Sequence, residues 1–254
     1  MALNTRGTSS SNKTYLNIFQ GNIVLEYDSQ ESLISKLDSL GLEYAEEISE
    51  TNRMGYVCER KRTKGRNEGK SVFYYILNDV SGMLTNIKST VNDFGEFVEL
   101  EFTDVDETFN VSLGDVYSRI CKDFIRRMGN IDLTKELVFG VWNISAEEAD
   151  NGKAKSGVKM YQDGTKLEYY IGYDEMPEPT TKKKGSKTIW NFDDQEEFLY
   201  DALSTFKDEN FLDETVSESL PTKTETPTPK AKATSHKPRA KATATANNTD
   251  DLPF

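Results

Sequence analysis

The chain has 254 residues, of which 36% are hydrophobic and 11% aromatic, and its formal net charge is −12 at neutral pH. This length and apolar content allow one sizeable domain or two small ones and exclude disorder of the whole chain. No apolar run approaches the roughly 18–20 residues of a membrane span, and the polar N-terminus lacks the apolar core of a secretory signal. We therefore expect a cytoplasmic protein with no membrane partner.

Cysteine and histidine residues are too few for a disulfide framework or a typical transition-metal site. The two cysteines are Cys58 and Cys121, and the single histidine, His236, lies in a low-complexity tail away from both. We expect no disulfide framework, no metal site and no cofactor. The acidic net charge disfavours binding of nucleic acid by the whole surface. A local basic groove is still compatible with it, because salt screens charges beyond about 8–10 Å.

The first half of the chain is predicted to form short strands and one helix. Residues 1–13 are small and polar and are expected to be a disordered leader. Apolar residues at helical spacing, followed by Gly41, predict a helix over 29–42. Alternating or β-branched segments predict strands at 14–19, 22–27, 55–60, 72–77, 80–90, 94–105 and 109–111.

A second helix is predicted over residues 115–128, where apolar side chains recur every four positions. Asp115 is its expected N-cap and Gly129 its expected C-terminal end. Cys121 is expected to be a small buried residue of this helix. The cations on one side, which we expect to be solvated, are Arg119, Lys122 and Arg126.

The remaining elements are a strand, a hairpin, a further strand and a helix. A strand is predicted over 136–144, and Asp163-Gly164 is a strong two-residue hairpin signal. The other segments are hairpin strands at 157–162 and 166–171, a polar excursion over 177–185, a strand over 189–192 and a helix over 193–206.

Many short strands, two or three helices and no strand–helix–strand rhythm predict a mainly β domain over residues 14–212. A small Greek-key barrel with added hairpins fits this pattern, and a larger sandwich is the competing architecture. Residues 213–249 have scarcely a large apolar side chain and are expected to be a flexible, disordered linker. They lead to an acidic tip, residues 250–254.

Cations and aromatic residues gather around residues 60–70, between two predicted strands. Single-stranded nucleic acid needs this combination, since cations pair with phosphates and flat rings stack on bases. The simpler interpretation is a solubilising loop beside core strands with buried rings. Further Lys/Tyr alternation in the hairpin favours binding. The predicted DNA-binding residues are Tyr56, Arg60, Lys61, Arg62, Lys64, Arg66, Lys70, Tyr74, Tyr75, Lys159, Tyr161, Lys166 and Tyr170.

Catalysis is not expected, because the sequence has no phosphate-binding loop, no nucleophile elbow and no metal-spaced His/Cys cluster. Asp104, Asp106 and Glu107 are close in sequence and are the kind of carboxylates that a metal-dependent nuclease uses. A solvated turn at a strand end is the favoured interpretation.

The tip, Asp250-Asp251-Leu252-Pro253-Phe254, resembles the acidic C-terminal tip of bacterial single-stranded DNA-binding proteins. Segments around 16–24, and from Phe94 through 130–133 to 162–164, are similar to phage-encoded proteins of this class. The resemblance implies an OB-fold, coating of single strands, and recruitment of a polymerase, helicase or primase through the tip. Leu252 departs from the usual isoleucine, and the linker is rich in Lys, Thr, Pro and Ala instead of Gly and Gln.

We therefore expect a non-catalytic, largely sequence-independent single-stranded DNA-binding protein that acts in phage DNA replication, recombination and repair, in the host cytoplasm. A β-rich structural or adaptor protein without nucleic-acid binding is the alternative from another class. A single-strand annealing protein is a third. A homo-oligomer is compatible with the sequence. The sequence does not distinguish a preference for DNA from one for RNA.

Overall fold

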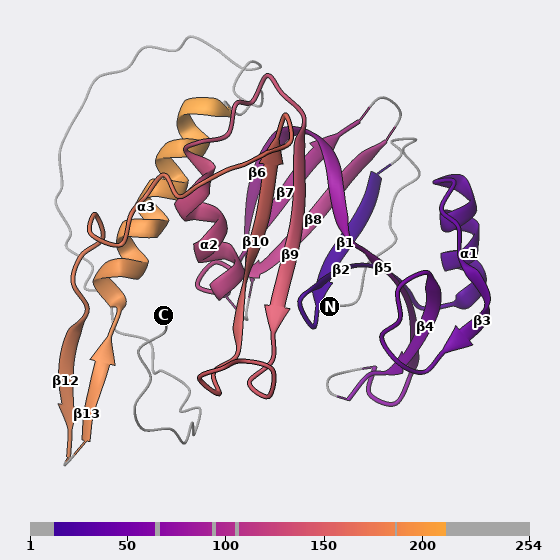
Figure 1. Ribbon diagram of the computed structural model, residues 1–254, viewed down its shortest axis with the longest axis horizontal. Coiled ribbons are helices and arrows are strands. Elements are labelled where there is room, and N and C mark those ends of the chain that lie inside the picture. Colours follow the sequence, from indigo (N-terminus) through magenta and orange to yellow (C-terminus); the bar gives the residue numbers. More distant parts are fainter. Residues whose placement is uncertain (1–12, 64–66, 93–94, 105–106, 186, 212–254) are drawn as a thin grey trace, which may run out of the picture. The chain divides into compact units, whose positions relative to one another are not determined.

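The computed structural model describes residues 13–63, 67–92, 95–104, 107–185 and 187–211 (Figure 1). The chain divides into a large unit, residues 1–179 with 192–212, and a small unit, residues 180–191 with 213–254. The predicted leader up to residue 12, the linker and the tip lie outside the described residues, as do Lys64 and Arg66. Lys13, assigned to the leader from sequence, begins the first strand.

The large unit is mainly β, as predicted, and is built on one mixed sheet with the order β11-β10-β9-β6-β7-β8-β1-β2-β5-β4-β3. Within the described residues its end strands, β11 and β3, do not pair, so hydrogen bonds do not close the sheet into a barrel. The strands are β1 (Lys13–Phe19), β2 (Asn22–Tyr27), β3 (Ala45–Ser49), β4 (Tyr56–Lys61), β5 (Ser71–Leu77), β6 (Asp79–Asn92), β7 (Gly95–Thr103), β8 (Thr108–Asp115), β9 (Leu137–Ile144), β10 (Lys155–Gln162) and β11 (Thr165–Lys166).

Two strand pairings organise the centre of this sheet. β1 pairs antiparallel with β2 and parallel with β8, so the first strand lies between two strands that are far apart in the sequence (Figure 1). The long strand β6 changes partner along its length: residues 79–82 pair with β9 and residues 83–92 with β7. β6 thereby joins the β9–β10 hairpin to the central strands.

Side-chain alternation gives the sheet a core face and an outward face. On β7, Val98, Leu100 and Phe102 are fully buried, as the sequence predicts, while Glu99 and Glu101 lie on the other face. Helix α1 (Gln30–Ser39), capped by Ser29, packs its buried leucines against β2 and β5. The main core therefore lies on one side of the central strands, and the other side carries a smaller apolar cluster of Val24, Cys58, Tyr74 and Ile76.

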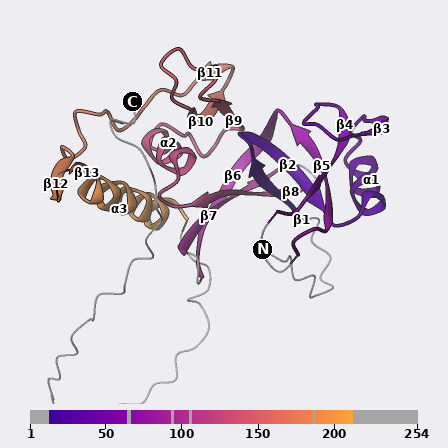
Figure 2. The same cartoon turned by 90° about the horizontal axis from the view of Figure 1, so that it is seen from below.

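Helices α2 (Arg119–Met128) and α3 (Asp193–Asn210) pack together (Figure 2). The Lys122 ammonium donates to Glu196 over 2.9 Å, and Lys207 donates to Ser89 of β6 over 3.0 Å. Asp115 is not the N-cap of α2, because β8 continues to that residue; Ser118 caps the helix by accepting from the Cys121 amide. Cys121 is buried, as predicted.

Two sequence predictions for the α2 region are wrong. The strand predicted over 166–171 is short: β11 is Thr165–Lys166, and the Leu167 amide makes one further hydrogen bond to Met160 of β10. The chain then leaves the sheet, and the Tyr170 and Ile171 amides donate to the carbonyl oxygen of Arg126. Arg126 is not on a solvated face but is 5% exposed. Its guanidinium lies 4.0 Å from the centre of the Tyr169 ring and 3.6 Å from that of Tyr173. Aromatic rings and a carbonyl oxygen thus bury this cation.

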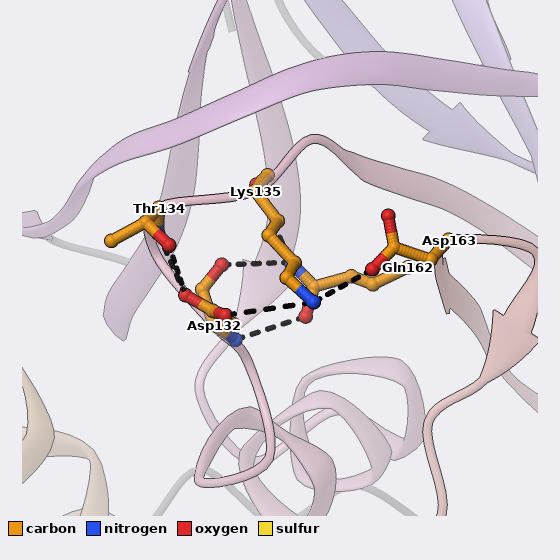
Figure 3. A network of polar contacts seen from close by, with 5 residues as sticks. All are labelled: Asp132, Thr134, Lys135, Gln162 and Asp163. Atoms are coloured by element: carbon orange, nitrogen blue, oxygen red, sulfur yellow. Dashed lines mark hydrogen bonds and ion pairs between the residues drawn. The ribbon is translucent and has the colours of Figure 1, made fainter.

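A polar network joins the loop after α2 to the turn between β10 and β11 (Figure 3). The Gln162 side chain accepts from the Asp132 amide over 2.9 Å and donates to the Asp132 carbonyl oxygen over 2.8 Å, while Lys135 pairs with Asp163 at 2.7 Å. Hydrogen bonds from Thr134 hold the pKa of Asp132 below its usual range, and the Asp163 contact raises the pKa of Lys135. Two segments that carry the resemblance, 130–133 and 162–164, are therefore in direct contact.

The small unit contains one antiparallel hairpin within its described residues. β12 (Thr180–Lys184) and β13 (Lys187–Asn191) pair from Thr180 with Asn191 to Lys184 with Lys187. The polar excursion predicted over 177–185 thus contains a strand, and the strand predicted over 189–192 begins two residues earlier.

Candidate nucleic-acid interface

The candidate site lies on the outward face of the central strands. On β1, Tyr15, Asn17 and Phe19 alternate with the core-facing Leu16 and Ile18. Strand pairing places outward residues of β8 and β7 beside them, since Ser112 lies opposite Glu99. Around β1, β7 and β8 this face is polar and aromatic, whereas the opposite face packs into the main core.

A groove of about 720 Å³ runs along this face. β1 lies at its middle, β2 and β4 supply one side, β7 and β8 the other, and the start of α2 and one residue of β10 complete it. The lining residues are Tyr15, Leu16, Asn17, Ile18, Phe19, Glu26, Arg60, Arg62, Phe97, Glu99, Ser112, Leu113, Gly114, Ser118, Arg119, Ile120 and Ser156.

Among the described residues, three aromatic rings line the groove. Tyr15 is 47% exposed, while Phe19 and Phe97 are partly buried. The guanidinium of Arg60 lies 4.4 Å from the centre of the Phe19 ring. Tyr15 lies on β1 and Phe97 on β7, with β8 between these strands, so the rings are distributed across the groove. Aromatic rings in a groove that also holds cations can stack on the bases of a single strand.

The arginines of the groove are paired with carboxylates but keep unused donors. Arg60 binds Glu26 at 2.5 Å, and Arg62 binds Glu26 at 3.3 Å and Asp28 at 3.1 Å. The Nε–H groups of Arg60 and Arg62 are buried and have no acceptor among the described residues. Arg119 donates to the Ala154 carbonyl oxygen over 2.5 Å. A buried donor without a partner costs about 1–3 kcal/mol, so an anionic ligand that supplies acceptors fits this side of the groove.

On the β7 side, the outward-facing glutamates Glu99 and Glu101 differ in their ion pairs and in the direction of their pKa shifts. Glu101 forms ion pairs with Lys88 and, at 3.3 Å, with Lys13. Burial raises the pKa of Glu101, but hydrogen bonds and charge from these lysines lower it more, and the pKa lies below its usual range. Glu99 lines the groove, and burial raises its pKa; the charge of Lys88 opposes this shift and that of Glu101 adds to it.

Of the residues predicted around 60–70, Arg60 and Arg62 line the groove. Lys61 is exposed at the intervening position, and Lys70 is exposed without lining the groove. Tyr56 is half-buried, with the Arg53 guanidinium 3.9 Å from its ring centre.

Tyr74 and Tyr75 are corrected by their burial, since they are 2% and 8% exposed. The Tyr74 ring belongs to a small apolar cluster with Val24 and Cys58, and its hydroxyl bonds Asn52. Tyr75 belongs to the main core, and its hydroxyl donates to the Glu43 carbonyl oxygen over 2.9 Å. Neither ring offers an exposed face for a base. The simpler interpretation of the sequence, in which these rings are buried in core strands, is the correct one for Tyr74 and Tyr75.

The predicted residues of the hairpin are not brought to the groove. Tyr161 pairs with Lys166 across β10 and β11, and Tyr170 is 61% exposed. Lys159 is exposed and lines a separate polar hollow of about 260 Å³ that also contains Trp142. Lys159, Tyr161, Lys166 and Tyr170 are therefore not part of the groove lining, although Ser156 of β10 is.

The sequence predictions missed Tyr15, Phe19 and Phe97. A signal existed: on β1 and β7 these rings occupy positions that alternate with apolar residues, so each strand has an aromatic residue on its outward face. The parallel pairing of β1 with β8 brings those strands together, and no local pattern predicts it.

The carboxylates considered for a nuclease form contacts of another kind. Glu107 accepts from Lys36 over 2.8 Å and from the Thr14 hydroxyl. Asp106 lies outside the described residues. In the part of the chain that the structure describes, no group of three or more His, Cys, Asp or Glu residues could hold a metal ion.

Comparison with protein-family models, curated proteins and solved structures finds no match to this chain. Among the described residues, no helix combines the length and apolar character needed to cross a membrane. The geometry of the groove is therefore the main guide to function.

Proposed function

We propose that the chain is a non-catalytic, largely sequence-independent single-stranded DNA-binding protein that coats single strands during phage DNA replication, recombination and repair in the host cytoplasm. The observation that carries this proposal is the groove, which is lined both by the Tyr15, Phe19 and Phe97 rings and by two arginines with unpartnered Nε–H groups, Arg60 and Arg62. Phosphates would accept from Arg60 and Arg62, and bases would stack on the rings.

The proposal includes an OB-like barrel as the underlying fold. Support comes from the turn between β1 and β2, which lies close to β9: a Cβ added at Gly21 would overlap that of Asn143. β9-β6-β7-β8-β1-β2 are consecutive in the sheet, so this contact brings the first and last of six strands near each other. In OB-folds, ligands lie across the barrel face and between its loops.

The proposal also assigns recruitment of replication proteins to residues 250–254. The support is their sequence, a pair of carboxylates followed by Leu252, Pro253 and Phe254. A flexible linker over 213–249 would span roughly 30–40 Å, which is enough for the anionic tip to compete for the cationic groove. DNA would displace the tip and free it for partners.

Binding is tested by fluorescence anisotropy with labelled oligo-dT and a duplex of equal length, over a range of salt concentrations. The single strand is expected to bind more tightly. Replacing both Arg60 and Arg62 with alanine should weaken binding and flatten the plot of log affinity against log salt by about one to two units. Lys61→Ala is the matched control, because Lys61 is the exposed cation between them. Equal binding of the duplex, or an unaltered slope in the double variant, would contradict the proposal.

Removal of residues 250–254 tests the recruiting role separately. The truncated chain should bind oligo-dT as tightly as the full chain or more tightly, and should lose capture of polymerase, helicase or primase from the host. Weaker DNA binding after truncation would contradict competition by the tip. A full chain that binds neither oligonucleotide would point instead to an adaptor protein.

A further inference from the structure

We propose that Glu99 is a base-reading residue, which accepts hydrogen bonds from the amino-bearing edge of a base, and of guanine above all. This inference rests on the proposed function, because it specifies which base binds beside Glu99 in the same groove. It makes binding dependent on base identity at one position, whereas the rings and arginines would accept any sequence.

The position of Glu99 fits this role. It lies on the outward face of β7, opposite Lys88 of β6 and Ser112 of β8. Phe97 precedes it by two residues on the same face and also lines the groove. A base stacked on that ring would present its hydrogen-bonding edge within reach of a neighbouring side chain in the plane of the sheet.

Glu99 also has unused acceptors. Among the described residues, no hydrogen bond or ion pair engages its carboxylate, although it is partly buried. Glu101, the next outward residue of β7, is engaged by both Lys88 and Lys13. A partly buried carboxylate without donors is unfavourable, so a ligand that brings N–H groups fits at Glu99 and not at Glu101.

The distribution of charge in the groove would orient a bound DNA strand. Arg60 and Arg62 lie on the side of β2 and β4, whereas Glu99 lies on the side of β7. Phosphates are attracted to the arginines and repelled by the carboxylate, so the backbone should follow the first side and the bases should point toward the second.

Base chemistry then sets the preference. Guanine presents two parallel donors, N1–H and an N2 amino hydrogen, that match both oxygens of a carboxylate. Cytosine and adenine each offer an amino group. Thymine offers only N3–H between two carbonyl oxygens, which the carboxylate repels. Guanine is expected to bind best at this position and thymine worst.

The test compares oligonucleotides of alternating thymine and guanine with the same oligonucleotides carrying inosine for guanine, in lithium buffer to suppress quadruplexes. Inosine lacks only the 2-amino group. The full chain should bind the guanine oligonucleotide at least about fivefold more tightly. Glu99→Gln should bring the ratio close to one, while the matched variant Glu101→Gln should keep it.

A ratio near one in the unchanged protein, or an unchanged ratio in Glu99→Gln, would overturn the assignment while leaving single-strand binding intact. Absence of binding to either oligonucleotide, and to oligo-dT, would overturn the proposed function and this assignment with it. Thermal melting checks that both variants fold, and Gln preserves the shape of the side chain.

Discussion

The guanidinium of Arg60 covers one face of the Phe19 ring, with 4.4 Å between its central carbon and the ring centre, while its Nη2 donates to Glu26. Cation–π contact and ion pair together hold Arg60 against the sheet. The same contact occupies part of the Phe19 surface. Tyr15 and Phe97 are therefore the rings of the groove that remain most available to bases.

Tyr15→Ala should weaken binding of single-stranded DNA, because Tyr15 is the most exposed ring of the groove. The expected loss is about 1–3 kcal/mol, or roughly fivefold to 150-fold in affinity by anisotropy titration. Tyr15→Phe should retain most of the affinity, since the ring is kept. Tyr117→Ala is a matched control: Tyr117 is 48% exposed but does not line the groove. Equal effects of the two alanine variants would place the stacking surface elsewhere.

Guanine preference should fall as the pH is lowered. Burial raises the pKa of Glu99, with Glu101 raising it further and Lys88 and Lys13 opposing the shift, so Glu99 protonates above the usual range of a carboxyl group. A protonated carboxyl no longer accepts at both oxygens. The guanine-to-inosine affinity ratio, measured from about pH 7 down to about pH 4.5, should therefore approach one, while oligo-dT binding strengthens as negative charge leaves the groove.

The same shift has a consequence for folding stability. A carboxyl group whose pKa is raised in the folded state contributes stability below its unfolded pKa, and that contribution is lost as the pH rises through the folded pKa. Charged Glu99 thus opposes folding near neutral pH. Glu99→Gln should have an equal or higher urea midpoint at about pH 7, and a clearly lower midpoint would show that the carboxylate has a stabilising partner.

Gly21→Ala should destabilise the protein more than Gly164→Ala. Both glycines occupy hairpin turns with positive φ, +75° and +72°, so each substitution carries backbone strain of about 1–3 kcal/mol. At Gly21 the new Cβ would also overlap Asn143, whereas at Gly164 it has no atom within 4 Å among the described residues. Urea denaturation measures both. Equal losses would mean that the turn between β1 and β2 does not pack closely on β9.

The thiols should be unreactive in the folded protein. Cys58 and Cys121 are both buried, and burial raises the pKa of Cys121 to about 12. Thiolate is the reactive species, so a thiol reagent at about pH 8 should label neither residue in buffer and both in denaturing urea. Rapid labelling of Cys121 in buffer would show that α2 opens readily.

Local patterns predicted most strands and the faces of the clearest ones. Val98, Leu100 and Phe102 alternate with polar residues, which was enough to assign both the strand and its core side. The run over 72–77 has no such alternation, so sequence could not separate Tyr74 in its small cluster from Tyr75 in the main core. Burial of these rings depends on elements distant in sequence.

The site was only partly predictable for the same reason. Arg60 and Arg62 were identified by composition, but their partners Glu26 and Asp28 come from a neighbouring part of the sheet that composition does not reveal. Arg126 has the sequence character of a solvated helix residue. It is buried because the chain returns over α2 and places Tyr169 and Tyr173 on it.

The parallel pairing of β1 with β8 also constrains the order in which the chain can fold. During synthesis the hairpin of β1 and β2 emerges long before β8, and until then one edge of β1 has no strand to pair with. Closing so long a loop carries an entropic cost that is recovered only when the distant strand arrives, which makes such topologies slow to fold. Until β8 has formed, the unpaired edge of β1 can also form hydrogen bonds with strands of other unfolded chains, which leads to aggregation. The yield of refolded protein should therefore be highest at low protein concentration.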